Sequence, residues 1–161
     1  MPNHVSHQIT IAGYTAEQIK ERYSSADRFF DFNKLIPTPP YVYQGCLGTQ
    51  DTKDFPNWLD WNTTNWGTKW NCYESKISDS EGGVVIEFDT AWSIPYPIIV
   101  VLANQLKSKQ MIHDYFDEGH NFWGREVWNG DTRQSKNKAE NLKRELCIKL
   151  KGYDPDNQDD D

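Results

Sequence analysis

Aromatic side chains must form much of any core that this chain can build. It contains seven Trp, eight Tyr and seven Phe, whereas hydrophobic residues of all kinds make up only 37% of its 161 residues. Each large aromatic side chain buries roughly 150–250 Å², which compensates for the scarcity of aliphatic residues. A chain of 161 residues fits one hydrophobic core, so we expect a single folded domain with an aromatic interior.

The chain is acidic, with a formal net charge of −7. Proteins that bind the phosphate backbone usually carry a basic surface, so this charge disfavours nucleic acid as the partner. Basic residues gather in 133–151, and an Asp-rich segment follows them directly. The overall charge favours a soluble protein with a basic partner, or one that imitates a polyanion.

Apolar periodicity and turn residues predict an ordered series of elements. They are a strand at 5–11, a helix opened by the capping box of Thr15 and Gln18, a strand at 29–36, a hairpin of strands 72–77 and 84–88, a helix at 95–106, a hairpin of strands 111–116 and 122–128, and a helix at about 135–150. This order predicts an α+β fold, a ferredoxin-like antiparallel sheet with helices on one face and an added C-terminal helix. We expect one domain over 1–152 and a disordered acidic tail over 153–161.

Residues 38–71 interrupt this order as a Trp-rich insertion. They combine several Pro and Gly residues with four Trp, and we expect one short helix around 54–61. Long loops inside compact domains tend to be functional or disordered. The four Trp argue against disorder here.

The most distinctive part of the insertion is the segment 65–71, NWGTKWN. Two Trp enclose a glycine turn and a lysine, a pattern typical of a cation–π surface or a protein–protein hot spot. The alternative is that both Trp pack in the core. A further Trp is expected to pack against this segment, and two acids at a hairpin turn are suited to a basic partner. The candidate binding residues are Trp66, Lys69, Trp70, Asn71, Trp92, Asp117 and Glu118.

The three cysteines, Cys46, Cys72 and Cys147, lie far apart and include no C-x-x-C pair. They are typical of reduced thiols in a cytoplasmic protein. The N-terminal residues lack the pattern of a signal peptide, and no apolar run is long enough to span a membrane. We therefore expect a cytoplasmic location and no membrane partner.

Neither the histidines nor the known catalytic motifs point to an active centre. His4 and His7 fall on opposite faces of the first strand, and His113 and His120 on separate strands. The sequence also lacks G-x-S-x-G, P-loop, G-x-G-x-x-G and C-x-x-C motifs. We expect no metal, no cofactor and no catalytic residue.

Five segments stand out by their residues and by their order. They are MPNHV at 1–5, FDFNKLIP at 30–37, NWGTKWN at 65–71, FDTAWS at 88–93 and DEG at 117–119. Together they resemble the YubB-type ferredoxin-like proteins of phages, prophages and conjugative plasmids of bacteria, over roughly residues 1–130. That family usually has two prolines after the Trp-Ser pair, whereas Ile94 stands first here. The resemblance implies a ferredoxin-like fold and a mobile genetic element in a bacterial host, but it supplies no catalytic residue.

Three functional hypotheses follow from these features. The first is a phage- or plasmid-encoded accessory protein that binds and inhibits a host defence complex, for example a CRISPR effector, without catalysis. The second is a nucleic-acid-binding module that uses Trp66, Trp70 and the basic C-terminal helix. The third is an enzyme that acts on a small substrate in a cleft between the insertion and the sheet.

Overall fold

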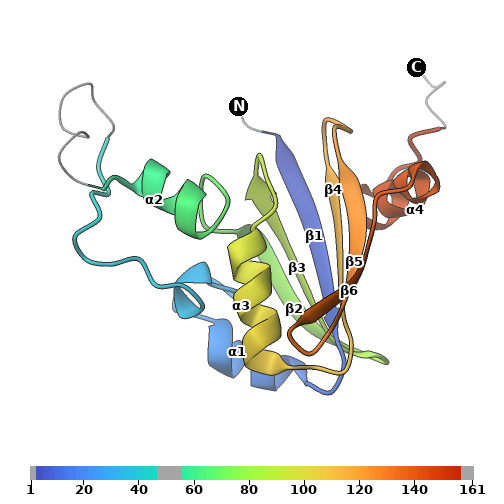
Figure 1. The fold of residues 1–161 in the computed structure, drawn as a ribbon, viewed down its shortest axis with the longest axis horizontal. Coiled ribbons are helices and arrows are strands. Elements are labelled where there is room, and N and C mark those ends of the chain that lie inside the picture. Colours follow the sequence, from blue (N-terminus) through green and yellow to red (C-terminus); the bar gives the residue numbers. More distant parts are fainter. Residues whose placement is uncertain (1–2, 47–55, 157–161) are drawn as a thin grey trace.

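The computed structural model describes residues 3–46 and 56–156. The elements follow one another along the chain as shown in Figure 1: β1 (His4–Ile11), α1 (Ala16–Tyr23), the 3₁₀ helix η1 (Phe32–Lys34), α2 (Trp58–Asn65), β2 (Tyr73–Ser80), β3 (Gly83–Ala91), α3 (Tyr96–Leu106), β4 (Met111–Asp117), β5 (Trp123–Asn129), β6 (Thr132–Asn137) and α4 (Glu140–Lys151).

The six strands form one antiparallel sheet in the order β2-β3-β1-β4-β5-β6. The first four strands, with α1 and α3 as their connections, have the split β-α-β arrangement of ferredoxin-like folds. β5 and β6 then extend the sheet beyond β4. The predicted α+β ferredoxin-like fold is therefore confirmed.

Helices cover both faces of the sheet (Figure 1). α1 and α3 bury side chains such as Ile19 and Ile99 in the main core on one face. α4 lies on the other face, where its Leu142 and Leu146 pack with Phe116 of β4. The added C-terminal helix thus closes a second, smaller core.

The main core combines a cluster of aromatic rings with a larger number of Ile, Leu and Val side chains, so the aromatic interior that the composition predicts is present only in part. Phe30, Phe32 and Phe88 are almost fully buried and contact one another ring to ring, and Tyr23 packs against Phe30. Such edge and stacked contacts add about 0.5–1.5 kcal/mol per pair to the burial of the rings.

The two helices of the main core begin as the sequence predicts. Thr15 Oγ1 accepts a hydrogen bond from the Gln18 N–H at 3.2 Å, and the Gln18 side chain accepts one from the Thr15 N–H at 2.9 Å. α3 begins directly after Pro95 and is the most apolar helix. Neither it nor any other helix of the described residues is long and apolar enough to cross a membrane.

Residues 29–36, predicted as a strand, form a loop that contains η1. Asp31 is the cause, because its Oδ1 accepts a hydrogen bond from the Asn33 N–H at 2.9 Å and caps a 3₁₀ turn. Phe30 and Phe32 both reach the core, as the alternating pattern requires. They reach it from this turn and not from a strand.

The short helix expected around 54–61 is shifted along the chain, to Trp58–Asn65. Asn57 sets its start, because its Oδ1 accepts a hydrogen bond from the Asp60 N–H at 2.9 Å. Residues 54 and 55 lie outside the described residues. The helix inside the Trp-rich insertion is therefore present, but it begins at an N-cap that the prediction missed.

The helix predicted at about 135–150 is wrong in its first part, because residues 135–137 belong to β6. Gly130, with a φ of 61°, forms the turn that brings β6 alongside β5. All six side chains of β6 are exposed, so no apolar alternation marked it as a strand. α4 starts only after Ala139, whose N–H donates to Asn137 Oδ1 at 2.9 Å.

The first residues of the acidic segment fold back on α4. Gly152 ends the helix in the left-handed conformation, with a φ of 84°. Beyond it, Asp154 forms an ion pair with Arg144 at 2.8 Å. The disorder expected over 153–161 therefore does not describe its first four residues. Residues 157–161 lie outside the described part of the chain.

Candidate functional site

The segment 65–71 connects α2 to β2 and lies against the start of α3. Gly67 makes this possible, because its φ is 83° and a Cβ there would lie 2.9 Å from Pro97 Cδ. The Ser93 hydroxyl donates a hydrogen bond to the Gly67 carbonyl and ties the segment to the chain that follows β3. Glycine is therefore a requirement of the turn.

Trp66 lies in the core. Only 4% of it is exposed, and its Nε1–H donates to the Ile36 carbonyl at 2.8 Å. Its ring makes edge contacts with Phe32 and Trp61. For Trp66, the structure thus agrees with the alternative that the Trp packs in the core. There it fixes the insertion to the domain.

Lys69, Trp70 and Trp92 form an exposed cluster, which we call the aromatic–lysine surface. The Lys69 Nζ lies 4.6 Å from the centre of the Trp70 ring and 4.4 Å from that of Trp92. Trp70 is 38% exposed and Trp92 is 48% exposed. Each exposed cation–π contact contributes about 0.5–1 kcal/mol, so the ammonium group favours this arrangement of the two indoles.

The backbone of Trp92 is held in an unusual conformation. Its φ is 74°, in the left-handed region that bulky residues rarely adopt. Holding a residue other than glycine in this conformation costs about 1–3 kcal/mol. The Trp92 N–H donates to the Asn3 carbonyl at 2.9 Å, and the Thr90 hydroxyl donates to the Ser93 carbonyl at 2.7 Å. These bonds on both sides of Trp92 maintain the strained turn and the outward position of its side chain.

Asn71 is buried and joins separate segments of the chain. Its Oδ1 accepts hydrogen bonds from the Phe32 N–H at 3.1 Å and from the Cys72 N–H at 2.9 Å. Its Nδ2 donates to Asp31 Oδ1 at 2.8 Å. The carboxamide is largely used within the fold, so its role is to hold η1 against the start of β2.

Asp117 and Glu118 differ in their surroundings. Asp117 is 1% exposed, and its Oδ2 accepts hydrogen bonds from the backbone and side chain of Asn121, so it organises the turn between β4 and β5. Glu118 is exposed and accepts a hydrogen bond from the His4 N–H at 2.6 Å. The residue before His4 bonds to Trp92, so Glu118 lies at the same end of the sheet as the aromatic–lysine surface.

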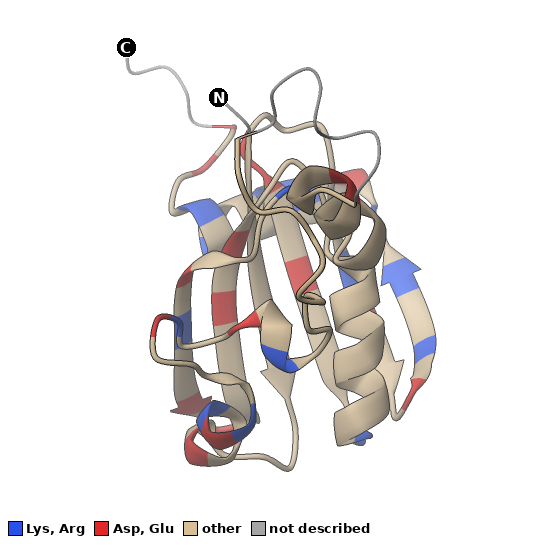
Figure 2. Ribbon diagram, turned by 90° about the vertical axis from the view of Figure 1, so that its left-hand side faces the viewer, with Lys and Arg blue, Asp and Glu red and all other residues tan. Residues whose placement is uncertain are grey.

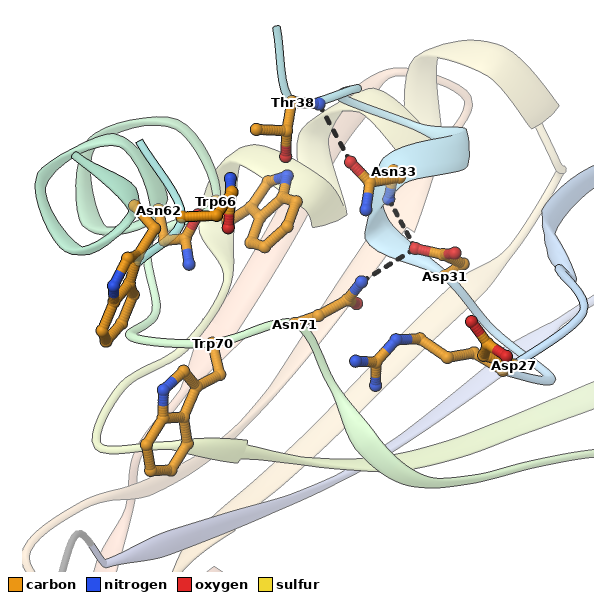
Figure 3. Close-up of a pocket in the computed structure, with 11 residues that line it drawn as sticks. Asp27, Asp31, Asn33, Thr38, Asn62, Trp66, Trp70 and Asn71 are labelled. Atoms are coloured by element: carbon orange, nitrogen blue, oxygen red, sulfur yellow. Dashed lines mark hydrogen bonds between the residues drawn. The ribbon is translucent and has the colours of Figure 1, made fainter. Parts of the chain in front are cut away.

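A polar cleft of about 520 Å³ opens beside this surface, between η1 and α2 (Figure 3). Trp70 is part of the aromatic–lysine surface and also lines the cleft. The sequence suggested a cleft between insertion and sheet but not the residues that line it from the loop before η1. The side chains that matter most for its chemistry are Arg28, Asp31, Trp58, Asn62, Trp70 and Asn71.

The carboxylate in this cleft is suited to binding rather than to proton transfer. Burial favours the neutral acid, but hydrogen bonds from Asn71 and from the Asn33 N–H, with the charge of Arg28, outweigh it and lower the pKa of Asp31. Asp31 is therefore ionised at neutral pH and accepts hydrogen bonds. A general acid or base requires a pKa near the working pH, which this environment opposes.

Sequence reasoning missed a chain of buried polar side chains in the main core. His7 Nε2 lies 2.8 Å from Thr90 Oγ1, and His7 Nδ1 lies 2.9 Å from His113 Nε2. Beyond it, His113 Nδ1 lies 3.6 Å from Glu126 Oε1. His7, His113 and Glu126 lie on predicted strands at positions whose side chains face the core, and this placement could have predicted a buried polar cluster. No group of three His, Cys, Asp or Glu side chains in the described residues is placed to hold a metal ion.

The strand order β2-β3-β1-β4, with α1 and α3 as connections, defines a ferredoxin-like α+β domain, to which β5, β6 and α4 are added. Residues 65–146 match the family described as the ferredoxin-like domain in Api92-like protein, and the chain belongs to that family. The matched residues include the whole aromatic–lysine surface and begin at the end of α2.

One comparison with a solved structure gives a distant similarity. The crystal structure of protein api92 from Yersinia pseudotuberculosis is 12% identical, with a TM-score of 0.48, and the match covers 54% of this chain and 32% of that chain. The matched part thus spans about a third of the length of that relative. No curated protein matches the chain.

Proposed function

We propose that this protein is a binding protein without catalytic activity. It is encoded by a phage or plasmid, acts in the bacterial cytoplasm, and docks on a host defence complex, for example a CRISPR effector, to inhibit it. The observation that carries the docking proposal is the pair of exposed indoles, Trp70 and Trp92, fixed on either side of Lys69. The mobile-element setting rests on the resemblance to YubB-type proteins.

The aromatic–lysine surface has the properties of a protein–protein hot spot. Trp is enriched among the residues that carry most of the binding energy at such interfaces. The fixed backbone of Trp92 and the ammonium between the rings reduce the conformational entropy that docking would remove. An acidic side chain of the partner would meet Lys69, and apolar side chains would cover the indoles.

The distribution of charge favours a partner with a basic channel. The only charged residues of β3 are Glu87 and Asp89, whereas β6, at the right-hand edge of Figure 2, carries Arg133 and Lys136. Lys76 of β2 lies opposite Glu87, so the net charge of −7, and not this strand alone, suits a surface that otherwise binds nucleic acid, and long-range attraction would speed the encounter.

The nucleic-acid hypothesis has less support. Trp66 is buried and presents no ring for a base to stack on. In α4, Lys149 pairs with Asp114 at 2.6 Å, and Arg144 pairs with Asp154 at 2.8 Å. Part of the basic charge of the helix is thus already neutralised within the protein.

The test is an affinity purification of the tagged full chain from bacteria that carry an active defence system, with and without nuclease. We expect a stoichiometric complex with a component of that system, which survives nuclease and is accompanied by weaker defence against phage. The Trp70→Ala/Trp92→Ala double variant should lose both effects. A Phe29→Ala/Tyr41→Ala variant should keep them, because these exposed rings lie outside the aromatic–lysine surface.

Three outcomes contradict the proposal. Recovery that disappears with nuclease supports the nucleic-acid module instead. Unchanged defence in the presence of the protein excludes inhibition of that system. Equal loss of binding in both double variants shows that the aromatic–lysine surface is not the docking surface.

A further inference from the structure

We infer that the cleft between η1 and α2 binds a neutral sugar, that is, a polyhydroxylated ring with one apolar face. This inference is independent of the proposed docking function. It rests on the size of the cleft, its indole walls, its planar polar side chains and its charge.

The cleft is suited in size and rigidity to a small ligand. Its volume of about 520 Å³ falls within the roughly 300–1,000 Å³ typical of small-molecule sites. Its walls are fixed by hydrogen bonds, from Asn71 to Asp31 at 2.8 Å and from the Thr38 N–H to Asn33 at 2.9 Å. Figure 3 shows both bonds at the edge of the opening. A ligand therefore meets a site that already has its shape.

Indole rings give the cleft flat apolar surfaces. Trp58 is partly exposed, Trp70 is 38% exposed, and the buried Trp66 lies behind them. The C–H face of a pyranose ring packs well on such a surface, because both partners are flat and the indole face carries partial negative charge. Among the described residues, no hydrogen bond uses the Trp70 Nε1–H, so it is available to a hydroxyl group.

The polar lining consists largely of amide side chains, which both donate and accept hydrogen bonds. Asn62 Nδ2 donates to the Lys69 carbonyl at 2.9 Å, and no bond within the described residues uses Asn62 Oδ1. Asn33 Oδ1 accepts a hydrogen bond, whereas no bond within the described part of the chain uses Asn33 Nδ2. Gln44 is exposed at the rim. Sugar hydroxyls have the same mixed character, so a ring of hydroxyl groups can satisfy this lining without leaving unpaired groups.

Formal charge indicates a neutral ligand. Among the described residues that line the cleft, Asp27 and Asp31 are acidic and Arg28 is the one cationic group. Arg28 already donates a hydrogen bond to the Cys72 carbonyl at 2.6 Å. A phosphate, sulfate or sugar acid would meet two carboxylates, whereas neighbouring hydroxyls of a neutral sugar can both donate to a carboxylate.

The experiment uses a glycan array that carries neutral, sialylated, sulfated and phosphorylated glycans. The array is probed with the labelled full chain. The best neutral glycan, as the free sugar, is then titrated by calorimetry against the protein and its variants. We expect binding to neutral glycans, with affinity at least about tenfold weaker in Trp58→Ala and Gln44→Ala. Phe29→Ala, an exposed aromatic outside the cleft, should bind like the unchanged protein.

Trp92→Ala separates this inference from the proposed function, because Trp92 does not line the cleft. It should weaken docking and leave sugar binding unchanged. The inference is overturned if no neutral glycan binds, if charged glycans bind more tightly, or if both cleft variants leave the affinity unchanged. Tighter binding of uridine or adenosine in the same titration also overturns it, in favour of a nucleoside site.

Discussion

Asn71 shows how one carboxamide can hold several segments together. Its oxygen accepts hydrogen bonds from the N–H groups of Phe32 and Cys72, and its nitrogen donates one to Asp31. These groups are buried, so no solvent replaces the amide if it is removed. At the scale of residues, this explains why a polar side chain in the most distinctive motif contributes to the fold rather than to contact with a partner.

We predict that Asn71→Ala lowers the free energy of unfolding by about 2–3 kcal/mol, because it leaves two buried N–H groups unpaired. Urea denaturation measures the change. Asn33→Ala is the matched control, since Asn33 is exposed and its bond to the Thr38 N–H can be replaced by water. Equal losses in the two variants would contradict the role assigned to Asn71.

The motif NWGTKWN defines the site region, but the sequence alone does not assign the roles of its members. The exposure of each Trp depends on the turn at Gly67, which places Trp66 under α2 and turns Trp70 outward. That geometry arises from contact with Pro97, which lies 30 residues along the chain. Long-range packing therefore decides which Trp can bind, and local spacing does not reveal it.

At the scale of elements, the turn after α2 contributes both to the stability of the fold and to the position of the aromatic–lysine surface. We predict that Gly67→Ala destabilises the protein by about 2–4 kcal/mol, because it combines an unfavourable left-handed φ with a contact of 2.9 Å to Pro97 Cδ. Relief of this contact must displace the aromatic–lysine surface, so partner docking should weaken as well.

Gly130→Ala is the matched control for this prediction. Its φ is also left-handed, at 61°, but a Cβ there meets no atom within 4 Å. It should cost only the conformational term of about 1–2 kcal/mol and leave docking unchanged. Thermal or urea unfolding of both variants measures the difference, and equal effects would show that the contact with Pro97 carries no cost.

Elements with an apolar pattern could be predicted from the sequence, and those without one could not. The strands β3, β4 and β5 and the helix α3 carry clear patterns and lie close to their predicted positions, whereas β2 buries only Ile77. β6 has six exposed side chains and exists because its backbone pairs with β5. In the Phe29–Ile36 region, by contrast, an alternating pattern predicted a strand, but the same side chains are buried by a capped 3₁₀ turn.

At the scale of the whole molecule, the buried chain from Thr90 to Glu126 links stability to pH. Burial opposes ionisation of Glu126, but the adjacent His113, with Tyr96 and Arg133, lowers its pKa to about 2, below the ordinary value of 4.5. This group therefore contributes stability above pH 4.5, and the contribution is lost as the pH falls towards 2.

His7 adds a second dependence in the same direction. Burial, with the charges of His113 and Lys151, lowers its pKa well below 6.5, so folding keeps it neutral. As the pH falls below 6.5, the unfolded chain takes up a proton that the folded protein excludes, and the folded state loses stability.

We predict that the free energy of unfolding decreases in two stages as the pH falls, through His7 below about pH 6.5 and through Glu126 between about pH 4.5 and pH 2. Urea denaturation at a series of pH values measures it. His7→Gln should remove the upper stage and Glu126→Gln the lower one. A stability that stays constant between pH 7 and pH 5 would contradict the role of His7.

The two outer strands of the sheet give the molecule unlike ends. β6 presents Arg133 and Lys136, while β2, which pairs only with β3 in the described part of the chain, carries Glu74, Lys76 and Asp79. Identical copies with two different free edges can add head to tail without ever closing into a ring, as growing fibres do. The irregular start of β2, where pairing shifts after Tyr73 and Glu74 has a φ of 55°, breaks the row of backbone groups that a second copy needs. We therefore expect this irregularity in one strand to hinder edge-to-edge pairing between copies of the protein.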